Sequence, residues 1–295
     1  MKNEIENITF SRFVKQKLPF DFVTIQELYE TISENKFDLS KPHRIEFHAL
    51  IIILDGDSKH FVDFKEEVLS PGTILPIAKG QIHSFNKEIT VKGYVVGFEE
   101  SFITQNINEK NLFHFLQIYN TSNIQIAKKS IDTLRPILQL IGNLHKDIDD
   151  NLKSEIIHST FMILLFQIKR LACNEHVFFD SERLKKFYLF KELIIKHYSE
   201  IHNAKDYAKR LNVSYNYLNE ISKEITNKTA KDFIDSWLLL EIKRNILEKK
   251  YTSQEIGFKM GFKEPSNFIR FFKKHTELTP LQFQEKLKKT NTIRD

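Results

Sequence analysis

Four polar side chains recur at helical spacing in the last third of the chain. They are Asn216, Asn219, Glu220 and Lys223. The intervals i, i+3, i+4 and i+7 place side chains on one face of a helix, so this set predicts a continuous polar face. In complexes with DNA, asparagine pairs with adenine, glutamate accepts a hydrogen bond from cytosine, and lysine binds phosphate. The set therefore indicates recognition of base edges, although Glu220 weakens the attraction to phosphate.

A second polar set follows about fifty residues later. Its members are Ser266, Asn267, Arg270, Lys273 and Lys274. Phe268 and Phe272 interrupt them at a spacing of four, which predicts a helix with one buried and one polar face. Arginine binds guanine through two hydrogen bonds, and lysine and serine reach phosphates. We expect this set to carry more of the affinity for DNA, because it holds three cations and no carboxylate.

Each polar set needs a scaffold of two short helices joined by a tight turn. Before the first set, an inward stripe is formed by Ala204, Tyr207, Ala208 and Leu211. Asn212 tolerates the left-handed conformation that the turn requires, and Ser214 is placed to cap the second helix. In that second helix, Leu218 and Ile221 are expected to point inward.

The second scaffold repeats this plan. Thr252 with Glu255 predicts a capping box. Gly257 permits close packing of the two helices, and Gly261 supplies the turn. We expect helix breaks at Asn203, Asn212, Asn227, Gly261 and Glu277.

A longer helix is predicted between the two pairs, from Lys231 to Lys250, after an initial helix from Leu184 to Tyr198. Its predicted buried side chains are Phe233, Trp237, Leu240, Ile246 and Leu247. Two helix pairs around a connector form an internal duplication, and each pair has the pattern of a helix-turn-helix, whose second helix fits the major groove. The alternative is a packing unit that merely has a polar outer face. Two units in tandem favour DNA binding.

The charge distribution supports this reading. Residues 181–295 hold 24 lysines and arginines against 15 acidic residues, a net charge of +9, whereas residues 1–180 hold 20 and 24, a net charge of −4. Such asymmetry points to nucleic acid or a membrane. The longest apolar run, Ala49–Leu54, is far below the ~18 residues of a spanning helix, so no membrane partner is expected. The single cysteine, Cys173, and the acidic N-terminus favour a cytoplasmic location.

The region from Arg44 to Phe102 has short strand patterns between turn signals, and it predicts an antiparallel β-sandwich or barrel. One strand is expected where Val91, Gly93, Val95 and Gly97 alternate with other residues. Aromatic side chains and one histidine are candidates to line an apolar effector pocket. They are Phe47, Phe61, Phe64, His83 and Phe85.

Two amphipathic helices are predicted after Ser122. The first apolar stripe consists of Ile131, Leu134, Leu138, Ile141 and Leu144, and the second of Ile156, Ile163, Leu164, Ile168 and Leu171. The helix pair is either a cover on the β region or a seam for a second subunit.

From these motifs the chain resembles the AraC/XylS family of bacterial transcription regulators. The resemblance spans roughly Leu184–Leu287 and is strongest in the segment IGFKMGFKEPSNFIRFFKKHTELTPLQF, from Ile256 to Phe283. The segment PGTILPIAKGQIHSF is similar to a cupin motif at Gly72, Gly80 and His83. Departures from the family pattern include Glu220, Trp237, Ile242, Asn227 and Glu277.

The resemblance implies an α+β multidomain chain. Residues 1–122 would form a cupin-like β-barrel that binds an effector, residues 123–180 a helical pair for dimerisation or cover, and residues 181–295 an all-α domain with two helix-turn-helix motifs joined by a linker helix. Its implied partners are double-stranded promoter DNA, RNA polymerase, a small-molecule effector and a second copy of the chain. Activation of transcription is favoured over repression.

No nucleophile elbow, phosphate loop or paired-carboxylate signature is present, so we expect neither an enzyme nor a cofactor. The plausible metal ligands are His43, Glu46, His48 and His83, and the closely spaced His-x-His pair of metal-binding cupins is missing. No metal is therefore expected, and His43 and His48 are interpreted as surface or barrel-mouth residues. Two alternatives to a specific regulator remain: a metal-dependent cupin enzyme with an appended helical domain, and a non-specific architectural DNA-binding protein.

Overall fold

The computed structural model describes residues 5–13, 18–34, 37–104, 123–146, 151–172 and 181–292. Cys173 lies outside these residues. The chain divides into two compact units. The β-rich unit is Glu6–Val177, and the helical unit is Phe178–Asp295 together with Met1–Ile5. Within the described residues, no helix is long and apolar enough to span a bilayer.

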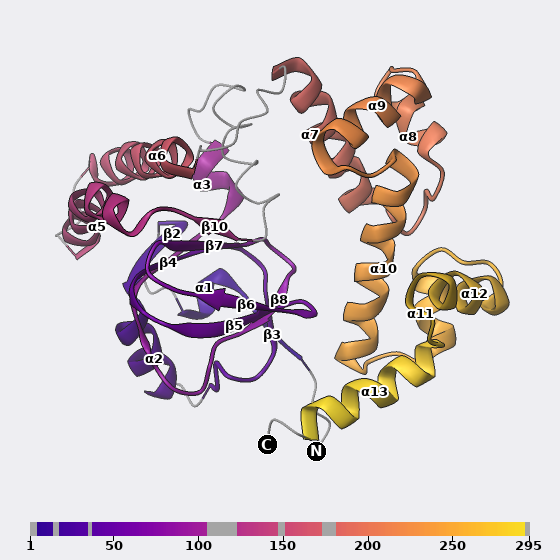
Figure 1. Cartoon of the computed structure of the whole chain (residues 1–295), viewed down its shortest axis with the longest axis horizontal. Coiled ribbons are helices and arrows are strands. Elements are labelled where there is room, and N and C mark those ends of the chain that lie inside the picture. The colour runs from indigo at the N-terminus through magenta and orange to yellow at the C-terminus, as the bar shows by residue number, and fades with distance from the viewer. Residues whose placement is uncertain are drawn as a thin grey trace. The chain divides into compact units, whose positions relative to one another are not determined.

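The strands of the β-rich unit form two five-stranded sheets (Figure 1). The first has the order β1 (Glu6–Ile8), β3 (His43–Ile45), β8 (Ile82–Ser84), β5 (Ser58–Val62) and β6 (Lys65–Leu69). The second has the order β10 (Ile124–Gln125), β7 (Thr73–Ile77), β4 (His48–Gly56), β9 (Val91–Phe98) and β2 (Phe20–Thr24). All pairs are antiparallel except β1 with β3. Among the described strands the sheets are separate, so the expected closed barrel is not found.

The longest apolar run of the sequence is the centre of strand β4. It lies between β7 and β9 and is buried on both faces. Leu50 and Ile52 pack into one core cluster, whereas Ile51 and Ile53 pack into another. Because side chains alternate between the two faces of a strand, a strand with a core on each side must be apolar at every position.

Helices α5 (Ile131–Lys146) and α6 (Lys153–Ala172) cover the second sheet through the first of these cores. The predicted stripe of α5 is confirmed, since Ile131, Leu134, Leu138 and Ile141 are buried and Leu144 packs partly buried against them. The inner faces of the pair therefore pack against the second sheet.

The predicted stripe of α6 was wrong at two positions. Ile156 and Ile163 are 41% and 51% exposed, whereas Ile157, Phe161 and Leu165 are buried. Isoleucines and leucines occur on both sides of this helix, so periodicity alone did not identify the inner face.

The described residues of the β-rich unit also form α1 (Phe10–Phe13), α2 (Ile25–Glu34) and α3 (Glu100–Thr104). The start of α2 is fixed by a reciprocal pair of hydrogen bonds between Thr24 and Glu27. A short 3-10 turn, Lys128–Ser130, precedes α5.

The helical unit consists of seven helices in the described residues. They are α7 (Ser181–His197), α8 (Ala204–Arg210), α9 (Tyr215–Thr226), α10 (Ala230–Glu248), α11 (Ser253–Lys259), α12 (Pro265–Thr276) and α13 (Pro280–Thr292). All five predicted breaks are confirmed: Asn203 caps α8, and Asn212, Asn227, Gly261 and Glu277 have φ values of 53°, 57°, 82° and 63°. These left-handed residues end one helix and set the direction of the next.

The buried face predicted for the connector α10 was only partly right. Ile246 and Leu247 are buried, but Phe233, Trp237 and Leu240 are partly exposed. The deepest side chains are Ile234, Leu238 and Ile242. Two separate cores enclose successive parts of α10, one around α7–α9 and one around α11–α13, so the helix has no single buried stripe.

Two substitutions test the turn after α12 and the turn after α11. Glu277 has a Cβ and adopts a left-handed conformation, which destabilises an L-residue by about 1–2 kcal/mol. We expect Glu277→Gly to raise the free energy of unfolding of the helical unit by about 1 kcal/mol. The reverse change, Gly261→Ala, places a Cβ 2.0 Å from the carbonyl oxygen of Ser199 and should be clearly destabilising.

Denaturant unfolding followed by the fluorescence of Trp237 measures both effects, because this is the chain's single tryptophan and it lies in α10. A lower stability for Glu277→Gly would contradict the assignment of strain to this turn.

Candidate nucleic-acid interface and effector cavity

The first helix pair presents one polar face of α9. The Ser214 hydroxyl accepts a hydrogen bond from the Tyr217 amide at 3.1 Å and thereby caps α9, as predicted. The predicted inward side chains of α8 and α9 are all buried. Asn216, Glu220 and Lys223 are consequently left exposed on the opposite side.

Asn219 is the exception on this face. It is half-buried, and its side-chain oxygen accepts a hydrogen bond of 3.1 Å from the amide of Ala230, the first residue of α10. A two-bond contact with adenine needs both the oxygen and the nitrogen of an asparagine amide. The structure thus assigns Asn219 a part in joining α9 to α10, which a motif read from spacing alone did not indicate.

The second helix pair presents the predicted polar face of α12. Thr252 and Glu255 form the predicted capping box of α11. A Cβ at Gly257 would lie 3.0 Å from the Phe268 ring, so the glycine allows the close approach of α12. Phe268 and Phe272 are fully buried. The exposed side chains opposite them are Ser266, Asn267, Arg270, Lys273 and Lys274.

Arg270 and Asn267 are preorganised on this face. Nη2 of Arg270 donates a hydrogen bond to the side-chain oxygen of Asn267 at 2.8 Å. The bond orients the guanidinium group and leaves its other N–H groups available. Such a fork is the geometry that binds guanine through two acceptors.

A polar bond joins the second helix pair to α10. Nζ of Lys259 in α11 donates to the side-chain oxygen of Asn245 at 3.1 Å. Beside it, Arg244 forms an ion pair with Glu241, and both side chains are less than 10% exposed. Removing one partner of a buried ion pair destabilises a protein by about 3–5 kcal/mol, so this pair within α10 stabilises the connector itself, while the bond from Lys259 to Asn245 joins α11 to it.

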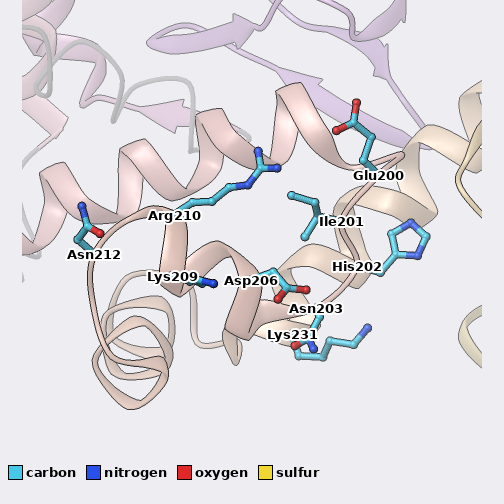
Figure 2. Close-up of a pocket in the computed structure, with 9 residues that line it drawn as sticks. All are labelled: Glu200, Ile201, His202, Asn203, Asp206, Lys209, Arg210, Asn212 and Lys231. Atoms are coloured by element: carbon cyan, nitrogen blue, oxygen red, sulfur yellow. The ribbon is translucent and has the colours of Figure 1, made fainter.

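An open depression of about 950 Å³ borders the first helix pair (Figure 2). Its lining comes from the loop before α8, from α8, from the turn residue Asn212 and from the start of α10. Lys209, Arg210 and Lys231 bring positive charge to it, and Glu200 and Asp206 bring negative charge. In a helix-turn-helix the second helix enters the major groove, so the site residues were predicted on the second helices, and these cations on α8 and α10 were not among them.

A small cavity of about 70 Å³ lies inside the β-rich unit. It is lined by three of the predicted effector residues, Phe47, His83 and Phe85. Phe61 and Phe64 do not line it, which corrects that part of the prediction. On β5 the inward positions are His60 and Val62, so Phe61 points to the other face. Phe64 lies in the turn between β5 and β6.

Three histidines meet beside this cavity. Nε2 of His60 and Nδ1 of His83 are 3.0 Å apart, and the rings of His43 and His83 lie 4.3 Å apart. All three are buried, so the surface position expected for His43 was wrong and the part played by His60 was missed. Strand register brings them together, because β8 pairs with both β3 and β5. His48 is only partly buried and lies outside the cluster.

Burial keeps these imidazoles uncharged. Desolvation lowers the pKa of His43 to about 4 and that of His60 to about 3, and it lowers the pKa of His83 well below its ordinary value. The described side chains contain no group of three or more histidine, cysteine or acidic residues arranged to hold a metal ion.

Comparisons with known proteins agree with the two-unit architecture. Residues 29–165 match the family model of the AraC-like ligand binding domain, and residues 207–286 match that of a helix-turn-helix domain. The Msm operon regulatory protein of Streptococcus mutans is 23% identical over 297 residues, covering 90% of this chain and 99% of that protein. The transcriptional activator RhaR of Mannheimia succiniciproducens is 22% identical, covering 83% and 87%. Among solved structures, ToxT from Vibrio cholerae aligns with a TM-score of 0.44 and 12% identity, covering 91% and 98%.

The Arg270–Asn267 pair gives a direct test of the α12 face. We expect Arg270→Ala to weaken binding to the chain's DNA site by about 1–3 kcal/mol and to relax discrimination at a single base pair. The control is Lys128→Ala, which removes an exposed cation from the β-rich unit and should leave the affinity unchanged. Fluorescence anisotropy with labelled duplexes measures both. Equal losses for the two variants would refute the assignment of Arg270.

The histidine cluster predicts acid sensitivity of the β-rich unit. In the unfolded chain a histidine takes up a proton below about pH 6.5, whereas the buried His43 and His60 do so only near pH 4 and pH 3. The stability that depends on neutral imidazoles is therefore complete above pH 6.5 and falls as the pH drops toward 4. The slope is at most about 1.4 kcal/mol per pH unit for each histidine.

Thermal unfolding between pH 7.5 and pH 4.5 measures this slope. His60→Gln, which cannot titrate, should flatten it. An unfolding midpoint that does not move with pH would show that the cluster is not buried in its neutral form.

Proposed function

Since this chain belongs to the AraC family of transcription regulators, we propose that it binds promoter DNA through α9 and α12 and that a small molecule held in the β-rich unit controls this binding. The family and the function as a DNA-binding regulator rest on the two domain matches and on full-length relatives that are themselves regulators. The assignment of individual residues rests on the geometry of the helical unit.

The observation that carries the assignment is the repetition of one arrangement. Two short helix pairs, α8–α9 and α11–α12, each turn at a left-handed residue and each expose polar side chains on the second helix. We interpret both as helix-turn-helix units. Their second helices would enter successive major grooves on one side of the duplex, about 34 Å apart.

The two units are not equivalent in this proposal. On α12, Arg270, Lys273 and Lys274 supply three cations, whereas α9 combines Lys223 with the carboxylate of Glu220. The side-chain oxygen of Asn219 is already engaged with α10. We therefore assign most of the affinity for DNA to α12. To α9 we assign the recognition of fewer bases, with Glu220 accepting a hydrogen bond from a cytosine amino group.

Activation and dimerisation extend the proposal. RhaR and RhaS of Mannheimia succiniciproducens are transcriptional activators, which supports activation through contact with RNA polymerase for this chain as well. A homodimer is supported by the outer face of α6, where Ile156, Ile163 and Phe166 are 38–51% exposed. These positions share one side of the helix, and exposed apolar side chains that lie together mark an interaction surface.

Footprinting on the DNA upstream of the chain's own gene and its neighbours tests the function. A specific regulator protects a defined site of two half-sites about one helical turn apart, whereas an architectural protein protects DNA without a preferred position. Uniform protection would therefore reject the proposal in favour of non-specific binding.

Salt dependence tests the phosphate contacts on α12. We expect Lys273→Ala to reduce the slope of log affinity against log salt by about one, because one fewer counterion is released. Lys128→Ala again serves as the control. An unchanged slope for Lys273→Ala would place this lysine away from the DNA backbone.

Replacing Glu220 should have opposite effects on the affinity for the specific site and on the affinity for random-sequence DNA. Glu220→Ala should weaken binding to the specific site by about 1–3 kcal/mol, since a base contact is lost. The same change should strengthen binding to random-sequence duplex, because a repulsive carboxylate is removed. Stronger binding to both duplexes would refute base recognition by Glu220 and leave repulsion as its effect.

A further inference from the structure

The cavity of the β-rich unit is lined by two histidines, by Asp21 and otherwise by apolar residues. His43 and His83 line it together with apolar side chains such as Ile45, Phe47 and Val95. About 10–15 Å³ of space accessible to a water-sized probe is enough for one water molecule. The roughly 70 Å³ found here therefore accommodates a ligand of several non-hydrogen atoms.

His83, one of the lining residues, carries an atom with no hydrogen-bond partner. Nδ1 of His83 is engaged with His60, while Nε2 of His83 is buried and unpartnered in the structure. Nδ1 of His60, the other end of the pair, is unpartnered as well. Leaving a buried polar atom without a partner is unfavourable, so a bound molecule that pairs with Nε2 of His83 gains from relieving this deficit.

The proton on the histidine pair can sit in either of two arrangements. If His83 donates to His60, Nε2 of His83 is an acceptor; if His60 donates to His83, Nε2 is a donor. His43 is fixed, because its Nδ1 lies 2.9 Å from the carbonyl oxygen of Lys41, which only accepts. The proton of neutral His43 is therefore on Nδ1, and its Nε2 is an acceptor. When His60 donates to His83, a hydroxyl group can accept from Nε2 of His83 while it donates to Nε2 of His43, and it then satisfies both histidines.

The charges around the cavity disfavour ions. Among the described lining residues there is no lysine or arginine. The single charged side chain in the lining is Asp21, whose carboxylate lies 3.0 Å from Nε2 of His145. A carboxylate ligand would thus enter an apolar cavity without a cation to pair with, which is strongly unfavourable.

We propose that the effector of this chain is a small uncharged molecule with an apolar body and one hydroxyl group, and that Nε2 of His83 binds that hydroxyl. This inference rests on the proposed role of the β-rich unit as an effector domain, and it specifies the chemistry of that role. His60 acts as a positioning residue, because it holds the His83 ring and sets its tautomer.

Three matched probes test the inference at pH 7.5 with the full chain. Phenol carries an apolar ring and a hydroxyl, toluene lacks the hydroxyl, and benzoate carries a negative charge. Calorimetric titration should show phenol binding at least about tenfold more tightly than toluene or benzoate, which is the effect of one well-placed hydrogen bond. Equal affinity for phenol and toluene, tighter binding of benzoate, or no binding of any probe would overturn the proposal.

Two further measurements assign the effect to His83. His83→Leu should abolish the preference for phenol over toluene, whereas His48→Leu, at a histidine outside the cavity lining, should retain it. If His83→Leu does not fold, nitrogen NMR of histidine-labelled wild-type protein decides the question. Phenol should shift the Nε2 resonance of His83 and toluene should not; equal shifts would overturn the proposal.

The experiment is independent of DNA binding. A chain that protects a defined DNA site but does not prefer phenol contradicts only the effector chemistry. A chain that prefers phenol but protects no site contradicts only the proposed regulatory function.

Discussion

The helical unit depends on the burial of α10 by two cores at once. Ile234 packs into the core of the first helix pair, and Leu238, one turn later, packs into the core of the second. Without α10, each core would be exposed on one side. A connector that is enclosed in this way cannot bend or rotate without opening apolar surface on both sides. The bond from Lys259 of α11 to Asn245 adds a directional constraint to the apolar ones. The separation and orientation of α9 and α12 therefore follow from the packing of one helix.

Much of the helical unit was predictable because its signals are local. Caps, left-handed turn residues and the apolar spacing of short helices operate within a few residues, and every predicted break was confirmed. The buried face of α10 was not predictable in the same way, because two cores from distant segments enclose it. The role of Asn219 was not predictable either. Its bond to Ala230 depends on how α9 packs against α10, and the position of Asn219 in the sequence does not indicate that packing.

In the β-rich unit, too, local features were predictable from the sequence and long-range contacts were not. Alternation and turn residues indicated the strands and left a sandwich or a barrel open, whereas the choice between them and the inner face of α6 depend on contacts far apart in the sequence. His43, His60 and His83 are separated by 17 and 23 positions and are adjacent only through strand register. A histidine also gives no sign, by its type, of whether it lies on a surface or in a core. Three of the five predicted effector residues therefore line the cavity, and Phe61 and Phe64 do not.

The bond from Asn219 to Ala230 also affects how such a protein can diverge. On α12 the Arg270 side chain bonds to Asn267 of the same helix rather than to the connector, so these two positions can change together as target sequences change. On α9, a change at Asn219 alters the junction with α10 together with the proposed DNA-binding face, and a beneficial change in one must be tolerated by the other. Binding specificity should accordingly drift faster in the second half of the site than in the first among descendants of this gene.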